Sequence, residues 1–73
     1  MEDKVIVTAE LKIMVDAATL AALRYIFQED MLTWSAYEVQ EQLEDYVRSL
    51  YPDFSAQLVT AIALRAMEKA IAQ

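Results

Sequence analysis

The sequence predicts an α+β fold, in which one N-terminal strand precedes three helices and pairs with the same strand of a second copy. Three observations lead to this prediction. Apolar residues alternate along residues 5–15, three later segments have helical spacing, and the alternating pattern does not recur. A lone strand leaves its backbone N–H and C=O groups unpaired, and a second copy of the chain offers the simplest partner. The pattern therefore predicts a homodimer.

The predicted strand covers residues 5–15 and has an apolar residue at every odd position: Val5, Val7, Ala9, Leu11, Ile13 and Val15. Alternation with period 2 is typical of a half-buried strand, and the β-branched run at residues 5–8 favours the same structure. The competing interpretation is one long helix from Glu10 through Phe27, because this stretch contains good helix formers and neither Gly nor Pro. That helix would have a weak apolar face made of Leu11, Met14 or Val15, Ala18 and Ala22.

Helices are predicted over residues 17–28, 35–50 and 55–72. Asp16 stands where the first helix would have its N-cap. Thr33 or Ser35 can cap the second helix, and Ser35 precedes Glu38 by three residues, as in a capping box. Pro52 ends the second helix because it disfavours helical geometry at Tyr51.

The third predicted helix begins after Asp53 or Ser55 and is apolar around most of its circumference. A helix of this kind is normally buried on several sides, and a 73-residue monomer offers little protein to surround it. This is a second argument for a dimer or for a partner protein.

The length of 73 residues indicates a single domain, 1–73, of a size that is marginally stable on its own. The chain has no Cys, which excludes disulfides and thiolate metal sites, and it has no His. Oligomerisation is the stabilising device that remains for so small a scaffold. Without His or Cys, and with each Ser near a predicted helix end, we expect no enzymatic activity, no cofactor and no metal.

The net charge is −6, from 12 acidic and 6 basic residues, and no basic patch is visible. The electrostatic footprint of nucleic-acid binding is therefore missing. No stretch is apolar enough to span a membrane, and residues 1–4 do not have the character of a signal peptide. We expect a soluble, cytoplasmic protein without a membrane partner.

Several short motifs lie between residues 9 and 50. Residues 11–16 read LKIMVD, with alternate apolar residues followed by a capping residue. Leu20, Leu23 and Ile26 follow with helical spacing, and residues 32–36 read LTWSA at the start of the second predicted helix. In this order the motifs resemble the ribbon-helix-helix family of small dimeric DNA-binding proteins.

The resemblance implies an intertwined homodimer whose two strands form an antiparallel ribbon in the major groove of DNA. The outward residues of that ribbon, which would contact base edges, are Glu10, Lys12 and Met14. The start of the second helix would bind a phosphate through residues Thr33, Trp34 and Ser35. The dimer interface would contain Leu11, Ile13, Val15, Val39, Leu43, Leu58 and Ile62.

Two functions follow from these observations. The first is a DNA-binding transcriptional regulator, or an antitoxin whose third helix engages a toxin. The second is an acidic protein-binding module, an adaptor or inhibitor, that presents Glu38, Glu41 and Asp45 to a basic partner and does not bind DNA. The net charge of −6 per chain disfavours DNA as a partner, because Lys and Arg supply most of the non-specific affinity for phosphates.

Overall fold

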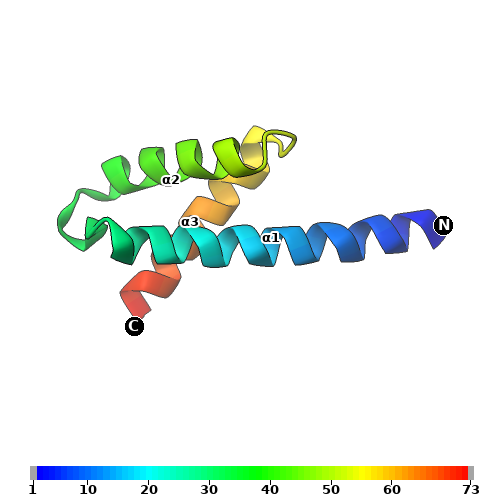
Figure 1. Ribbon diagram of the computed structural model, residues 1–73, viewed down its shortest axis with the longest axis horizontal. Helices are drawn as coiled ribbons and strands as arrows, with labels where there is room; N and C mark the ends of the chain where they lie inside the picture. The colour runs from blue at the N-terminus through cyan, green and yellow to red at the C-terminus, as the bar shows by residue number, and fades with distance from the viewer. Residues whose placement is uncertain (1, 73) are drawn as a thin grey trace.

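The computed structural model describes the backbone of residues 2–72 and the side chains of residues 9–72. It contains three α-helices and one short 3-10 helix: α1 (Glu2–Gln28), η1 (Met31–Thr33), α2 (Ala36–Leu50) and α3 (Ala56–Ala72). α1 and α2 run side by side in opposite directions, and α3 crosses behind them (Figure 1). Each helix packs against the other two. Because residues 2–72 contain no strand, the predicted α+β class is wrong.

The segment predicted as a strand, residues 5–15, forms the N-terminal half of α1. The competing interpretation of one long helix from Glu10 through Phe27 is correct for residues 10–15, although α1 begins eight residues earlier. A helix satisfies its backbone hydrogen bonds within the segment, so it needs no second copy for this purpose, whereas a lone strand does. The antiparallel ribbon between two chains is therefore also wrong.

Asp16 is not a helix N-cap, because it lies in the middle of α1. Its carboxylate is 3.9 Å from Nζ of Lys12, one turn earlier. Thr19, one turn after Val15, donates a hydrogen bond from its hydroxyl to the Val15 carbonyl at 2.7 Å. The helix continues through this region because no Gly or Pro interrupts it.

The turn after α1 reverses the chain direction at Asp30, which adopts a left-handed conformation with φ 52° and ψ 49°. Asp is one of the few residues other than Gly that are often found in this conformation. The Asp30 N–H donates to the Phe27 carbonyl at 3.3 Å. The turn leads into η1, which begins with the buried side chain of Met31.

Side chains cap both later helices. The Ser35 hydroxyl accepts a hydrogen bond from the Glu38 N–H at 3.3 Å and donates one to the Glu38 carboxylate at 2.9 Å. α2 ends at Leu50, two residues before Pro52. Of the two candidates for the cap of α3, the one that binds the helix is Ser55, whose hydroxyl accepts from the Leu58 N–H at 3.2 Å.

The core lies where the three helices meet and is built within one chain. Small residues on α1 and α3, such as Ala22 and Ala66, are fully buried and let the two helices approach closely. The buried residues of the core are Ala18, Ala22, Ile26, Met31, Val39, Leu43, Val47, Val59, Ile62, Ala63, Ala66 and Ala70. Three residues predicted for a dimer interface, Val39, Leu43 and Ile62, belong to this core. Their burial therefore does not depend on a second copy.

The N-terminal half of α1 extends beyond the ends of α2 and α3 (Figure 1). The described backbone measures 45 × 23 × 16 Å, with a radius of gyration of 12.9 Å. A compact chain of this length would have a radius of about 11 Å. The projecting part of α1 accounts for this difference, and it leaves side chains such as Ile13 outside the three-helix body.

Candidate functional site

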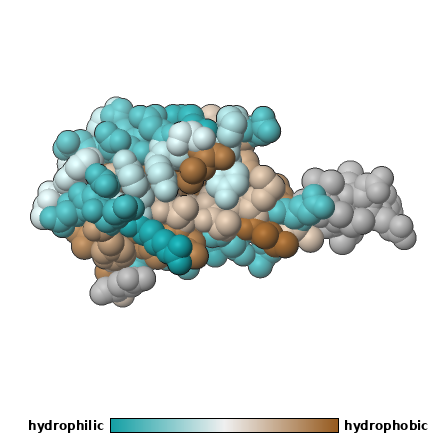
Figure 2. Space-filling model, in the orientation of Figure 1, coloured by the Kyte–Doolittle hydropathy of each residue, from teal (hydrophilic) through white to brown (hydrophobic). Residues whose placement is uncertain are grey.

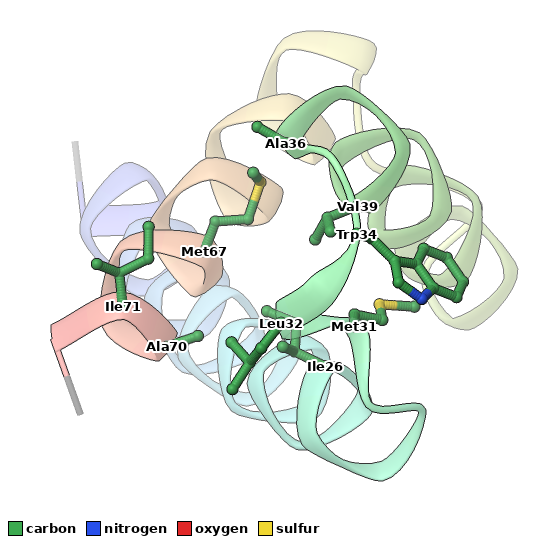
Figure 3. A pocket seen from close by; sticks show the side chains of 9 residues that line it. All are labelled: Ile26, Met31, Leu32, Trp34, Ala36, Val39, Met67, Ala70 and Ile71. Carbon is green, nitrogen blue, oxygen red and sulfur yellow. The ribbon is translucent and has the colours of Figure 1, made fainter.

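An apolar groove lies where η1 meets the start of α2 and the end of α3 (Figure 3). We call it the η1 groove, and its lining residues are Ile26, Met31, Leu32, Trp34, Ala36, Val39, Met67, Ala70 and Ile71. Its volume is about 140 Å³. Pockets for small molecules usually measure about 300–1,000 Å³, so this groove is better suited to an apolar side chain.

The floor and the walls of the η1 groove come from different elements. Ile26 and Met31 are buried and form its base. Figure 3 shows Val39 of α2 and Met67 of α3 on opposite sides of the groove, with Leu32 below them. The turn after α1 thus places η1 across the groove from the end of α3.

The η1 groove is open to solvent along its rim. Ile71 is 81% exposed and Leu32 is 55% exposed, although both are large apolar side chains. Trp34 also lines the groove, and its indole lies on the outer side of the loop between η1 and α2 (Figure 3). Clustered exposed apolar residues in a polar surround mark an interaction surface more often than isolated ones do.

A shallower hollow along α3 continues this apolar surface. It is lined by Ala61, Leu64, Arg65, Met67, Glu68 and Ile71. The hollow shares Met67 and Ile71 with the η1 groove. An apolar track therefore runs from η1 along the outer face of α3, which is the face that neither α1 nor α2 covers.

Several acidic residues are close in sequence to residues that line the η1 groove. Glu29 and Asp30 precede Met31, Glu38 precedes Val39, and Glu68 follows Met67. Of the two basic residues of α3, Lys69 lines a separate hollow with α1 residues, and Arg65 lines both that hollow and the one along α3. The surroundings of the groove are thus more negative than positive.

The residues predicted for base contacts do not share a face. Glu10 and Met14 are four positions apart and lie on the same side of α1, whereas Lys12, between them, points about 200° away from each. The ribbon face that the ribbon-helix-helix resemblance implies does not exist. Met14 and Lys12 are exposed on different sides of α1.

The three residues predicted to bind a phosphate have three different structural roles. Thr33 ends η1, Trp34 lines the η1 groove, and Ser35 caps α2. The Glu38 carboxylate accepts a hydrogen bond from Ser35 at the N-terminus of α2. A negative charge in this place opposes a bound phosphate.

The predicted acidic face of α2 consists of Glu38, Glu41 and Asp45, which are all exposed. Their spacing of three and four residues puts them on one side of the helix. Asp45 forms an ion pair with Arg48 at 3.2 Å. The role of this face in binding a basic partner stays a prediction.

The remaining residues predicted for a dimer interface lie in two environments. Leu11 and Ile13 are exposed on the projecting part of α1. Val15 and Leu58 are partly buried against the core. Leu32, Met67 and Ile71 were not predicted to form a surface cluster, although the nearly all-round apolar character of residues 56–72 was a signal for the last two.

Comparisons with models of protein families, with curated proteins and with solved structures return no significant match to this chain. The ribbon-helix-helix resemblance is therefore wrong on two counts, since no family match supports it and the strand it requires is helical. Among the described residues, no cluster of three or more acidic side chains could hold a metal ion. None of the helices in residues 2–72 has the combination of length and apolarity that crossing a bilayer requires.

Proposed function

We propose that this chain is a protein-binding module that takes a basic, amphipathic helix of a partner protein along the η1 groove. The observation that carries the proposal is the groove itself, an open apolar hollow of about 140 Å³ with Leu32 and Ile71 exposed on its rim. Amphipathic helices bind other proteins by laying an apolar face into such grooves.

The size of the groove supports a side-chain anchor on the partner. One Leu or Phe could fill the space between Val39 and Met67, while neighbouring apolar residues of the same helix contact the track along α3. Binding energy at protein interfaces is concentrated in a few buried anchors of this type. Burial of Ile71 and Leu32 by the partner would also remove exposed apolar surface from water.

Charge supports a basic partner. The chain has a net charge of −6, and three acidic residues, Asp30, Glu38 and Glu68, are next in sequence to residues that line the groove, against one basic residue, Lys69. Lys or Arg residues flanking the apolar face of the partner helix would be attracted to this surface. The sequence predicted, as one alternative, that acidic residues on the outer face of α2 bind a basic partner. We propose the same kind of partner, with the η1 groove as its binding site.

Trp34 offers a direct measurement, because it is the only Trp in the chain and it lines the groove. We would titrate the protein with two synthetic helical peptides that lack Trp and Tyr. Both carry the same Leu-rich apolar face, and their polar faces carry only Lys or only Glu. We expect the Lys peptide to shift the Trp34 emission and to bind at least about tenfold more tightly than the Glu peptide.

Leu32→Glu tests the location, with Leu50→Glu as its matched control. Both residues are exposed leucines, at 55% and 45%, so neither substitution should unfold the chain, and Leu50 does not line the groove. We expect Leu32→Glu to weaken binding of the Lys peptide about tenfold or more and Leu50→Glu to leave it within about twofold. Equal binding of both peptides, or equal effects of both substitutions, would overturn the proposal.

A further inference from the structure

The outer face of α1 carries a second apolar surface, which shares no residue with the η1 groove. Ala9, Ile13, Ala17, Leu20 and Phe27 follow one another at spacings of three, four and seven residues and are all exposed. We call this set the α1 stripe. We propose that two copies of the chain associate through their α1 stripes, with the two α1 helices antiparallel.

The α1 stripe lies on the side of α1 that faces away from the core. α1 packs on the other helices through Ala18, Ala22 and Ile26, which lie on the opposite side of its axis when residues are placed about 100° apart. α1 is thus apolar on two opposite faces, and α2 and α3 cover only one. Figure 2 shows tan and brown atoms along the course of α1 below the mostly hydrophilic surface of α2.

The residues of the stripe fit one antiparallel register. If Leu20 lies against the partner's Ala17, then Ala17 lies against the partner's Leu20, and each large side chain meets a small one. The same register places Ile13 beside the partner's Arg24 and Phe27 beside the partner's Glu10. In this register the central pair is apolar, whereas Ile13 and Phe27 each lie beside a charged residue of the partner, in the alternation of contacts seen in antiparallel coiled coils.

Charge also favours the antiparallel arrangement. Arg24 is an exposed cation within the span of the stripe, and Glu10 is an exposed acid near its N-terminal end. In the antiparallel register the partner's Glu10 lies within about one helical turn of Arg24, so long side chains can meet. A parallel pair would instead put Glu10 beside the partner's Glu10 and Arg24 beside the partner's Arg24, which is repulsive.

The projecting half of α1 gains most from this arrangement. Within one chain, Ile13 is 69% exposed, because neither α2 nor α3 covers the outer face of α1. In the antiparallel pair, residues 10–14 of one copy lie beside residues 23–27 of the other, which are held by the core of that copy. Each projecting segment is then supported by the packed half of its partner.

The first test is the mass of the intact chain by sedimentation equilibrium, over about 1–100 µM, where micromolar dissociation constants are measured. We expect a dimer. Leu20→Glu should raise its dissociation constant about 100-fold or more, because the substitution puts one negative charge from each copy near the two-fold axis. Leu64→Glu is the matched control, since Leu20 and Leu64 are 47% and 45% exposed and Leu64 lies on α3. The control should leave the dimer unchanged.

The second test is a charge swap that reports the register. Glu10→Arg alone and Arg24→Glu alone should each weaken the dimer about tenfold, and the double substitution should restore it to within about threefold. Glu10 and Arg24 of one chain are about 21 Å apart along α1, so restoration cannot come from a contact within the chain. Three results would overturn the proposal. The chain could be a monomer at about 100 µM, or the dimer could be lost in Leu64→Glu and kept in Leu20→Glu. The third is a doubly substituted chain that dimerises more weakly than either singly substituted one.

Discussion

The phenol ring of Tyr25 lies parallel to that of Tyr46, with 4.1 Å between the ring centroids and 3° between the ring planes. The two residues join the last part of α1 to α2. Both are only partly exposed, and Tyr25 packs against the core. The stack therefore links α2 to the part of α1 that carries the turn into η1 and the groove.

We expect the Tyr25–Tyr46 stack to couple α1 and α2 energetically. In a double-mutant cycle with Tyr25→Leu and Tyr46→Leu, the coupling free energy should be about 0.5–1.5 kcal/mol, the usual range for a buried aromatic pair. Urea unfolding followed by circular dichroism measures it. A cycle with Tyr51→Leu and Tyr46→Leu is the control, since the ring of Tyr51 stacks on Phe54. Coupling that is no larger than in this control would contradict the assignment.

Thr60 and Glu44 form a hydrogen bond that joins α3 to α2. The Thr60 hydroxyl donates to Oε2 of Glu44 at 3.0 Å, and the Gln40 amide donates to the same oxygen at 3.1 Å. We expect Thr60→Val to lower the free energy of unfolding by about 1–2 kcal/mol, because it leaves a partly buried carboxylate with one donor fewer. Arg48→Met should cost less than about 1 kcal/mol, since the Arg48 side chain, which is 3.6 Å from Glu44, is half-exposed. Equal losses would contradict this ranking.

The N-cap of α2 should contribute measurably to stability. Ser35→Ala removes the hydroxyl that accepts from the Glu38 N–H, and we expect it to lower the free energy of unfolding by about 1 kcal/mol. Ser49→Ala is the control within the same helix, because the Ser49 hydroxyl donates to the Tyr46 carbonyl one turn back. Such a bond adds little, so the control should change stability by less than about 0.5 kcal/mol. A cost for Ser49→Ala as large as for Ser35→Ala would argue against the cap.

We expect the chain not to bind duplex DNA, even at about 50 mM salt, where electrostatic attraction is strong. The net charge is −6, and the Glu38 carboxylate occupies the N-terminus of α2 that was predicted to bind phosphate. Fluorescence anisotropy of a labelled random-sequence duplex measures this directly. Binding that weakens steeply as salt rises, and further in Lys12→Ala, would instead support the DNA-binding alternative.

Local sequence signals determined both ends of α2 and the start of α3. These signals are the capping box of Ser35 and Glu38, the proline at Pro52, and the cap at Ser55. They act through hydrogen bonds and backbone geometry within four residues of their own position, so the tertiary structure has little influence on them. Composition likewise excluded disulfides and histidine chemistry without reference to the fold. These features follow from covalent chemistry and short-range contacts.

The structure of residues 5–15 and the η1 groove depended on contacts between distant residues. Alternating apolar residues fit a half-buried strand, but Ile6 and Met14 at even positions make the segment equally compatible with a helix that is apolar on several sides. The helix forms as one continuous element with residues 16–28, where Ala18 and Ala22 pack closely on α3. The groove forms because the chain turns at Asp30, in a left-handed conformation, and η1 then lies across from the end of α3, some 40 residues later in the chain. A sequence pattern records the spacing of residues along one segment, and only the packing of helices decides which faces meet and which stay exposed.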